Sequence, residues 1–520
     1  MHIVMLAAEN DALPGGKVGG IGDVMRDVPP ALAALGHDIT VVMPSYGIFH
    51  KLEGAEKVTL MPVAFADSTE QIEVHRLLDP VVENVQFLVL EHPQFSIGGE
   101  GRIYCNDSSD APFASDATKF ALFSLAAGHL IVNDITERPD AIHLHDWHTA
   151  FLAILRAYDK TLARLQSIPL VYSIHNLAIQ GIRPLSETDS SLGAWYPQLE
   201  YDITAVNDPR WPTCVNPMAA GIRLSDAIHT VSPGYAKEIL QPSRVEEDSY
   251  YGGEGLELEL NAAFEQGRLS GILNGCDYQA TRPEPLEWPA LMSSLHNQVQ
   301  TWITERQVLR TSDYLADQRL MSWSSRAEPR HLITSIGRLT EQKARLFTCE
   351  DEHGSNLLEH LLLSLGHRGV FILLGSGDPV YEQFFARAAG LHTNFLFLNH
   401  YSETLAQQLY ASGNLFLMPS SFEPCGISQM LSMRAGQPCL AHAVGGLRDT
   451  IKDNTDGFTF SGKDFSEQGE NFLAGFSAAL KLREQHPVQW QRICNNAEKA
   501  RFLWSDSVQQ YVDKLYQPHV

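Results

Sequence analysis

The chain has 520 residues, 44% of them hydrophobic, and its 38 Lys and Arg against 62 Asp and Glu give a formal net charge of −24. A single hydrophobic core rarely grows beyond roughly 300 residues, so at least two large lobes are expected. A chain with this net negative charge is unsuited to binding nucleic acid or an anionic membrane surface. If its substrate is an anion, positively charged side chains must be concentrated at the binding site.

The cysteines and the apolar stretches bear on location. Seven cysteines are scattered without any C-x-x-C pair, which fits neither a disulfide framework nor a structural zinc site and predicts a cytoplasmic protein. The N-terminal run MHIVMLAAEN reaches Glu9 at once, so it predicts a first strand rather than a signal peptide. The least polar longer stretch, residues 120–132, is shorter than the ~18 residues that a membrane span requires.

Short apolar runs alternate with helical patterns along the first half of the chain. Residues 2–8 predict a strand, followed by a glycine loop, a helix and a second strand at 39–44. A strand, a crossover and a strand within about fifty residues indicate a parallel, doubly wound sheet. Further strands are predicted at residues 85–91, 140–146, 169–175 and 226–232.

The second half repeats this pattern, with strands predicted at 331–338, 369–377, 415–420 and 438–446. Residues 281–330 show no strand pattern and are taken as a hinge. The sequence thus predicts an α/β fold with two doubly wound, Rossmann-like lobes and parallel sheets, 1–280 and 281–500, followed by an amphipathic helix at 501–520. Because the carboxyl ends of parallel strands face the crevice where ligands bind, we expect a ligand between the lobes.

The first motif is KVGGIGD, residues 17–23, between the first strand and the first helix. Glycines here let backbone N–H groups approach an anion, which a helix N-terminus also favours. The spacing is not that of the dinucleotide fingerprint, and the Gly-Lys-Ser/Thr of a Walker loop is missing. A tight turn without a ligand is the alternative interpretation.

The second motif is HLHDWH, residues 143–148. Its three histidines suggest a metal, and a metallo-hydrolase is one hypothesis. However, His143 and His145 alternate along a strand and share one face, while Asp146 points to the other. This arrangement favours a hydrogen-bonded cluster with one catalytic group over a metal site.

The third motif is Ser-Ile-His-Asn, which ends the strand at 169–175. The polar pair His175 and Asn176 stands at the carboxyl end of a parallel strand, where ligands bind in such sheets. A half-buried structural histidine is the alternative.

The fourth motif, GRLTEQK at 337–343, places Arg338 at a strand end and Lys343 after a turn. A guanidinium and an ammonium so placed can clamp a diphosphate. A solvated basic turn is the alternative, but the net charge of −24 favours anion binding.

The fifth motif joins PSSFEPCGISQ, residues 419–429, to GGLRDT, residues 445–450. Glu423, with a proline and a glycine close after it, has a constrained backbone suited to holding sugar hydroxyls or a developing cation. Gly445 and Gly446 offer N–H groups for phosphate at a helix start. They could equally form a plain turn.

Together these strings resemble the family of bacterial glycogen synthases and plant starch synthases, retaining glucosyltransferases of GT-B architecture. They follow the family's order over nearly the whole chain: KVGGIGD (17–23), HLHDWH (143–148), SIHNLAIQG (173–181), TVSPGY (230–235), GILNGCD (271–277), RLTEQK (338–343), GSGD (375–378), PSSFEPCGI (419–427) and VGGLRDT (444–450).

The resemblance implies transfer of glucose from ADP-glucose to the non-reducing 4-hydroxyl of an α-1,4-glucan with retention, and a C-terminal helix packed on the N-terminal lobe. It implies that Arg338 and Lys343 neutralise the leaving diphosphate, that Glu423 holds glucose hydroxyls and that Tyr401 stacks on adenine. By matching positions it implies catalytic roles for Asp146, His175, Arg338, Lys343 and Glu423, and substrate binding by Lys17, Gly19, Gly20, Asp23, Asn176, Tyr401, Cys425, Gly426, Gly445, Gly446 and Leu447.

No cofactor is expected. The chain contains no Asp-x-Asp, so a metal-bridged diphosphate is not predicted, and the two cations of the fourth motif would take that role. A covalent nucleophile is the usual route to retention, but the family offers none, and a front-face route is the alternative. Oligomeric state leaves no signal in the sequence.

Several alternatives stay open within this resemblance. Another donor such as UDP-glucose, or a small-sugar acceptor, fits the same architecture. An inactive glucan-binding scaffold is disfavoured because the two cations of the fourth motif and Glu423 are all present. The chain departs from the family at Ser421, where many members carry a basic residue, at Val444, where many carry threonine, and after Asp277, where the hinge diverges.

Overall fold

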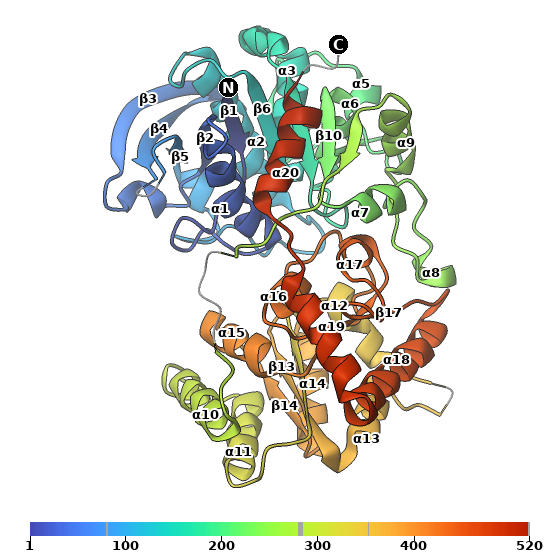
Figure 1. Ribbon diagram of the computed structural model, residues 1–520. Coiled ribbons are helices and arrows are strands. Elements are labelled where there is room, and N and C mark those ends of the chain that lie inside the picture. Colours follow the sequence, from blue (N-terminus) through green and yellow to red (C-terminus); the bar gives the residue numbers. More distant parts are fainter. Residues whose placement is uncertain (80–81, 279–283, 352, 518–520) are drawn as a thin grey trace. The chain divides into compact units, whose positions relative to one another are not determined.

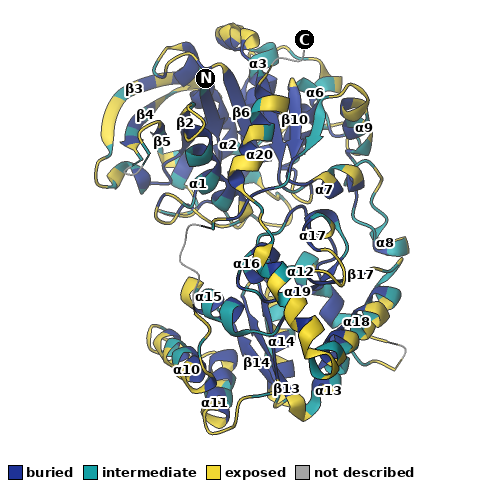
Figure 2. Ribbon diagram, in the orientation of Figure 1, coloured by how far each residue is buried: buried dark blue, intermediate teal, exposed yellow. Residues whose placement is uncertain are grey.

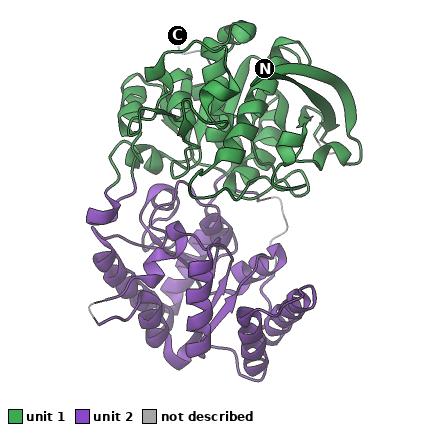
Figure 3. Ribbon diagram, turned by 180° about the vertical axis from the view of Figure 1, so that it is seen from behind, with its two compact units in different colours: residues 1–243, 252–275, 503–520 green, residues 244–251, 276–502 purple. Residues whose placement is uncertain are grey.

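The computed structural model describes residues 1–79, 82–278, 284–351 and 353–517, and the chain forms two compact units (Figures 1 and 3). Unit 1 combines residues 1–243 and 252–275 with the C-terminal segment from Leu503, and unit 2 combines residues 244–251 with 276–502. Residues 281–283 of the predicted hinge and residues 518–520 of the predicted C-terminal helix lie outside the described residues.

Unit 1 is built on a nine-stranded sheet of order β11-β10-β7-β6-β1-β2-β5-β4-β3. Its strands are parallel except where β4 pairs with β3 and β5. The strands are β1 (His2–Leu6), β2 (Asp38–Pro44), β3 (Glu56–Phe65), β4 (Ser68–Leu78), β5 (Val85–Glu91), β6 (Ala141–His145), β7 (Leu170–Ile174), β10 (Ala227–Thr230) and β11 (Leu269–Gly271).

The antiparallel edge of this sheet was not predicted from the sequence. β3 and β4 form a hairpin whose two-residue connection places Ala66 at φ 52°. Such connections usually carry Asn-Gly or Asp-Gly, which is the signal that sequence patterns rely on. Here Ala-Asp takes that place, so the hairpin leaves no clear turn signature.

Unit 2 contains a six-stranded, wholly parallel sheet of order β14-β13-β12-β15-β16-β17. Its strands are β12 (His331–Ile336), β13 (Gly369–Leu374), β14 (Phe395–Leu398), β15 (Leu415–Met418), β16 (Cys439–His442) and β17 (Phe458–Phe460). This is the strand order of dinucleotide-binding folds, in which the direction of winding reverses beside the first strand. The sequence missed β14 and β17, which are only four and three residues long.

Helices cover both sheets, and a short antiparallel pair, β8 (Arg183–Pro184) with β9 (Cys214–Val215), lies apart from them. In unit 1 the helices are α1 (Gly20–Ala33), α2 (Ala114–Val132), α3 (Trp147–Tyr158), α4 (Leu192–Trp195), α5 (Ile203–Val206), α6 (Pro217–Leu224), α7 (Pro233–Glu238), α9 (Glu257–Glu265) and α20 (Trp504–Tyr511). In unit 2 they are α8 (Val245–Asp248), α10 (Trp288–Thr304), α11 (Thr311–Ser324), α12 (Glu341–Thr348), α13 (Leu357–Leu365), α14 (Pro379–Leu391), α15 (Glu403–Ser412), α16 (Ser428–Arg434), α17 (Gly445–Thr450), α18 (Phe465–Gln485) and α19 (Pro487–Lys499).

The parallel strands at the centre of each sheet are buried on both faces, as expected of strands that read as continuous apolar runs, whereas β3 and β4 alternate between buried and exposed residues. In Figure 2 the central strands are dark blue, whereas the edge strand β3 and the helices α10, α18 and α19 carry exposed yellow stretches. The apolar stretch at 120–132 lies in α2, whose residues are almost all buried in the unit 1 core. None of the described helices combines the length and the apolar character needed to cross a bilayer.

The C-terminal segment returns to unit 1 and contacts α1 (Figure 1). Its helix α20 is shorter than predicted and continues into a π-helical turn, Val512–Tyr516. The indole N–H of Trp504 donates to Asp27 at 3.0 Å, and the Ser507 hydroxyl donates to the carbonyl of Leu273 at 2.6 Å. These bonds attach the segment to α1 and to the residues just after β11.

Candidate active site

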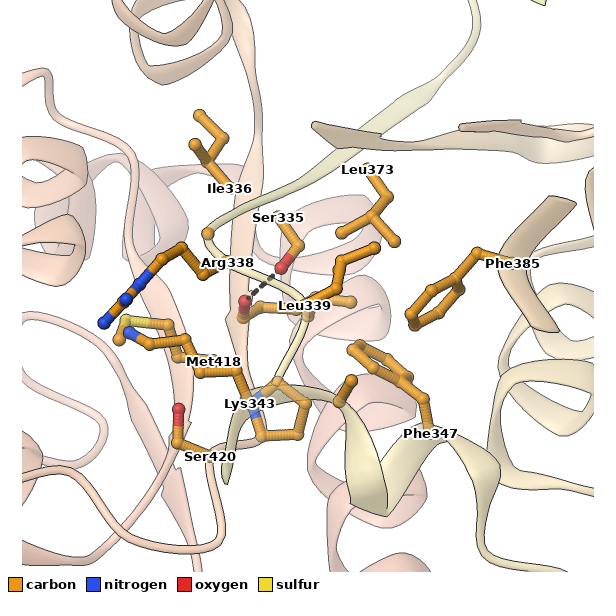
Figure 4. A pocket seen from close by; sticks show the side chains of 14 residues that line it. Ser335, Ile336, Arg338, Leu339, Lys343, Phe347, Leu373, Phe385, Met418 and Ser420 are labelled. Carbon is orange, nitrogen blue, oxygen red and sulfur yellow. Dashed lines mark hydrogen bonds between the residues drawn. The ribbon is translucent and has the colours of Figure 1, made fainter. Parts of the chain in front are cut away.

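A pocket in unit 2 lies at the point where the winding of the sheet reverses. The carboxyl ends of β12 and β15, which are neighbours there, supply most of its walls (Figure 4). Figure 4 shows the cations Arg338 and Lys343 on one side and the rings of Phe347 and Phe385 on the other. Nucleotides bind at such a switch point in doubly wound sheets.

The two cations of this pocket have different partners. Nζ of Lys343 lies 3.0 Å from a carboxylate oxygen of Glu423, to which Ser420 Oγ also donates at 3.1 Å. The Arg338 side chain is exposed and has no carboxylate partner in the part of the chain that the structure describes. Arg338 therefore contributes an unneutralised charge, whereas Lys343 also stabilises the buried carboxylate of Glu423.

The loop that carries Glu423 packs tightly against the start of α17. The N–H of Gly446 donates to the Glu423 carbonyl at 3.0 Å, and a Cβ at Gly446 would lie 2.3 Å from the carbonyl oxygen of Cys425. The N–H of Leu447 donates to the carbonyl of Val444. In this structure these two N–H groups are therefore used within the protein and Gly446 allows close packing, while the binding of phosphate by this loop stays a prediction.

Two further predicted positions lie near these elements. Gly426 has φ +80°, in the left-handed region that glycine adopts without strain, and its missing Cβ leaves room for Gln429 Oε1. Tyr401 lies between β14 and α15, is 58% exposed, and donates its hydroxyl to Glu403. Its predicted stacking on adenine stays a prediction.

The close packing at Gly446 predicts that a larger residue at this position lowers the stability of unit 2. Gly446→Ala is expected to destabilise unit 2 by about 1–3 kcal/mol, because the new methyl group meets backbone atoms that cannot move away cheaply. The matched control is Gly390→Ala in α14, where the nearest atom to the new Cβ lies 3.8 Å away. Thermal unfolding of both variants checks this, and equal melting temperatures would contradict it.

In unit 1 the winding reverses beside β1, which lies between β2 and β6. Nζ of Lys17, in the loop after β1, lies 2.5 Å from a carboxylate oxygen of Asp23 and 3.3 Å from one of Asp11. The guanidinium of Arg26 contacts the same two carboxylates. Burial lowers the pKa of Lys17, but the charges of Asp23 and Asp11 outweigh it and leave this pKa raised. Lys17 is thus charged but already paired with carboxylates.

A carboxylate that sequence patterns did not single out holds the glycine loop. Glu9 is buried, and one of its oxygens accepts the N–H groups of Val18, at 2.9 Å, and Gly19. Its other oxygen accepts the hydroxyl of Tyr104 at 2.6 Å. The N–H of Gly19, predicted to face an anion, is therefore occupied in this structure. The available sequence signal was a glutamate directly after the apolar run at 2–8.

Asp146 follows β6 in a backbone conformation that few residues other than glycine adopt. Its φ of 54° and ψ of −174° are strained for a residue with a Cβ, and strain of this kind persists where the surroundings impose it, often at functional sites. Its carboxylate accepts the N–H of His175 at 2.7 Å and a backbone bond from Asn176. Burial raises the pKa of Asp146 to about 7, although these bonds oppose the shift.

Two histidines of the second motif belong to a stacked, hydrogen-bonded cluster in unit 1, whereas His148 packs against Phe120 and Trp147. The rings of His143 and His145 stack at 4.3 Å, which confirms that they share a face. The two nitrogens of His143 lie 2.6 Å from Ser173 Oγ and 2.8 Å from the Tyr516 hydroxyl. Among the described residues no group of three or more metal-ligating side chains is arranged to hold an ion.

The predicted site residues therefore form two sets, each within one unit. The structure brings Arg338, Lys343 and Glu423 to one pocket region, with the Gly446 loop packed beside them. In unit 1 it brings Asp146, His175 and Asn176 together, while Lys17, Gly19, Gly20 and Asp23 belong to the loop after β1 and the start of α1.

Comparisons with known proteins cover both units. The family model for the starch synthase catalytic domain matches residues 2–262, and that for group 1 glycosyl transferases matches residues 330–474. Glycogen synthase from Streptococcus sanguinis is 33% identical over 533 residues, and that from Streptococcus gordonii 32% identical over 532, with 99% of each chain covered in both cases.

Solved structures share the fold. Starch synthase IV from Arabidopsis thaliana, bound to ADP and acarbose, matches with a TM-score of 0.74 at 27% identity, covering 99% of this chain and 98% of that one. Sucrose-phosphate synthase from Thermosynechococcus elongatus, at 14% identity and a TM-score of 0.54, covering 98% of this chain and 97% of that one, shares the fold alone. The predicted α/β fold with two doubly wound, parallel-sheet lobes is confirmed.

Proposed function

The chain belongs to the glycogen synthase and starch synthase family, and from that premise we propose that the glucose it transfers to an α-glucan comes from ADP-glucose and is added to a non-reducing 4-hydroxyl with retention. The observation that carries this proposal is Arg338, a guanidinium in a pocket wall with no carboxylate partner in the described chain. In a protein of net charge −24, such a group is suited to an anionic ligand.

The chemistry places the largest developing charge on the leaving diphosphate. As the bond between glucose C1 and the phosphate oxygen breaks, Arg338 and Lys343 stabilise the negative charge. The bond from C1 to the acceptor oxygen forms on the same face, and the acceptor proton passes to the leaving phosphate. That starch synthase IV was solved with ADP and acarbose supports a nucleotide and a glucan as the ligands.

The remaining residues hold the sugar in this proposal. Glu423, already fixed by Lys343 and Ser420, accepts glucose hydroxyls, and Asp146 and His175 line the glucose and acceptor side. No disulfide joins the cysteines, all of which lie in the described residues, and a reducing cytoplasmic location belongs to the same proposal.

A donor assay tests the proposal. Radiolabelled ADP-glucose and UDP-glucose are each incubated with glycogen, and label in the precipitated polymer is counted against Arg338→Ala and Lys343→Ala variants. Labelled polymer from ADP-glucose at a rate at least tenfold above that from UDP-glucose is expected. Equal or higher transfer from UDP-glucose would overturn the donor assignment, and no label above the variants would overturn the proposal.

A further inference from the structure

Two buried histidines of unit 1, His145 and His175, are joined by a hydrogen bond. This bond determines whether the exposed ring nitrogen of His175 carries a proton. Nδ1 of His145 lies 2.9 Å from Nε2 of His175. His145 has no exposed surface, and His175 is 9% exposed at the end of β7. Burial lowers the pKa of His145 well below its usual value and that of His175 to about 4, so both rings are neutral at neutral pH.

Two neutral rings joined in this way share one proton, which leaves two arrangements. In the first, His145 carries the proton on Nδ1 and donates to His175. In the second, His175 carries it on Nε2 and donates to His145. The hydrogen-bond partners of the other ring nitrogens distinguish the two arrangements.

The distal nitrogen of His145 selects the first arrangement. Nε2 of His145 is fully buried and has no hydrogen-bond partner among the described residues. In the second arrangement Nε2 of His145 would be protonated, and its N–H would be buried without an acceptor. Buried N–H groups that lack an acceptor are rare in proteins. In the first arrangement Nε2 is a bare lone pair, which is the less costly defect.

The consequence appears at the other end of the pair. If Nε2 of His175 accepts, the proton of the neutral His175 ring must be on Nδ1. Nδ1 of His175 makes no hydrogen bond within the described chain and is not among the fully buried polar atoms. We propose that His145 is a positioning residue that holds His175 as an Nδ1–H donor, so that His175 offers a hydrogen bond to an oxygen of the bound sugar substrate.

The surroundings of His145 hold it in place for this role. His143 stacks on its ring, and the His145 backbone N–H donates to Thr149 Oγ1 at 2.8 Å. The rings of His145 and His175 are 5.2 Å apart and inclined by 30°. The inference rests on the proposed function, because that function brings a sugar to His175.

The first test reads the tautomer directly. In ¹⁵N-histidine protein without substrate, long-range ¹H–¹⁵N correlation spectra are recorded, and the His175 signals are assigned by their loss in His175→Gln. In the wild type we expect the His175 ring to be protonated on Nδ1. In His145→Phe we expect a mixture of the two His175 tautomers, because no donor faces Nε2. In His145→Asn, whose amide can donate from a similar position, we expect the Nδ1-protonated tautomer to return. A His175 ring protonated on Nε2 in the wild type, or a tautomer unchanged in His145→Phe, would overturn the proposal.

The second test is a kinetic double-mutant cycle. His145→Phe is expected to lower kcat/KM for the glucose donor roughly tenfold, the effect of about one lost hydrogen bond, and His145→Asn to restore most of it. In a His175→Ala background, His145→Phe should have no further effect on kcat/KM. Additive losses would overturn the proposal even if the folds are intact.

The two tests separate this inference from the proposed function. If His175→Ala leaves kcat/KM unchanged, the role of His175 in the proposed function is wrong, whichever tautomer the spectra show. If His175→Ala is impaired but the tautomer does not depend on His145, the proposed function stands and the positioning role fails.

Discussion

Replacing Arg338 with alanine is expected to lower kcat for glucosyl transfer by about 100- to 1,000-fold, with an unchanged melting temperature. Removing a single preorganised group that stabilises developing negative charge typically has an effect of this size. Folding should tolerate the change, because the Arg338 side chain is exposed and has no ion pair or hydrogen bond among the described residues. Initial rates at saturating donor and glycogen, together with thermal unfolding, measure both quantities.

Arg338 is a sharper test than Lys343. Removing Lys343 would also leave the buried Glu423 carboxylate without its ammonium partner, so a loss of activity could arise from local unfolding. The matched control is Arg387→Ala, which removes another exposed arginine of unit 2, in α14, outside the pocket walls. Arg338→Lys should recover part of the loss, because it restores the charge but not the planar fork. A normal kcat in Arg338→Ala would contradict the assigned role.

The second large effect concerns stability and pH at Asp146. Burial raises its pKa from 3.8 to about 7 in the folded protein, so the folded state holds this proton more tightly than the unfolded chain does. As pH rises from about 4 to about 7, the contribution of Asp146 to the free energy of unfolding is therefore lost. With about 1.4 kcal/mol for each unit of pKa shift, the loss approaches ~4 kcal/mol.

Asp146→Asn should remove this pH dependence. The asparagine oxygen can still accept the N–H of His175, but the side chain no longer titrates. Relative to the wild type, the variant should gain up to ~4 kcal/mol between pH 4 and pH 7, with no further change above that range. Urea unfolding of both proteins at half-unit pH steps measures the difference.

The control for this series is Asp506→Asn, which removes an exposed carboxylate from the first turn of α20. It should follow the wild-type pH dependence. The carboxyl ¹³C signal of Asp146, identified by its absence in Asp146→Asn, gives the titration directly. A midpoint near 4, or parallel stability curves for the wild type and Asp146→Asn, would show that burial does not shift this group.

Much of the fold could be predicted because parallel sheets leave a strong local signal. Strands buried on both faces read as apolar runs, and β5 and β12 begin at the residues predicted for them. β14 and β17, of four and three residues, were not predicted, although β15 and β16, of four residues each, were. The β3–β4 edge was missed because its turn lacks the usual glycine.

The sequence predicted which residues belong to the candidate site, but not which side chains they contact. Polar groups at strand ends, such as Arg338 and Asp146, stand out from the apolar runs before them. The partners of these groups cannot be recognised in the sequence. Side chains 80 residues apart, such as those of Lys343 and Glu423, meet only when neighbouring strands have paired. Strand order in a sheet results from packing of the whole chain, not from any local pattern.

The sequence by itself determined the fold class, the strings at the strand ends and the family to which they belong. Only the tertiary structure decided how those groups are used. It assigned the Gly19 N–H to Glu9 and the Gly446 N–H to the Glu423 carbonyl, and it brought His145 within hydrogen-bond distance of His175. The physical reason is that hydrogen bonds and pKa values depend on distance and burial, which exist only once distant segments are packed together.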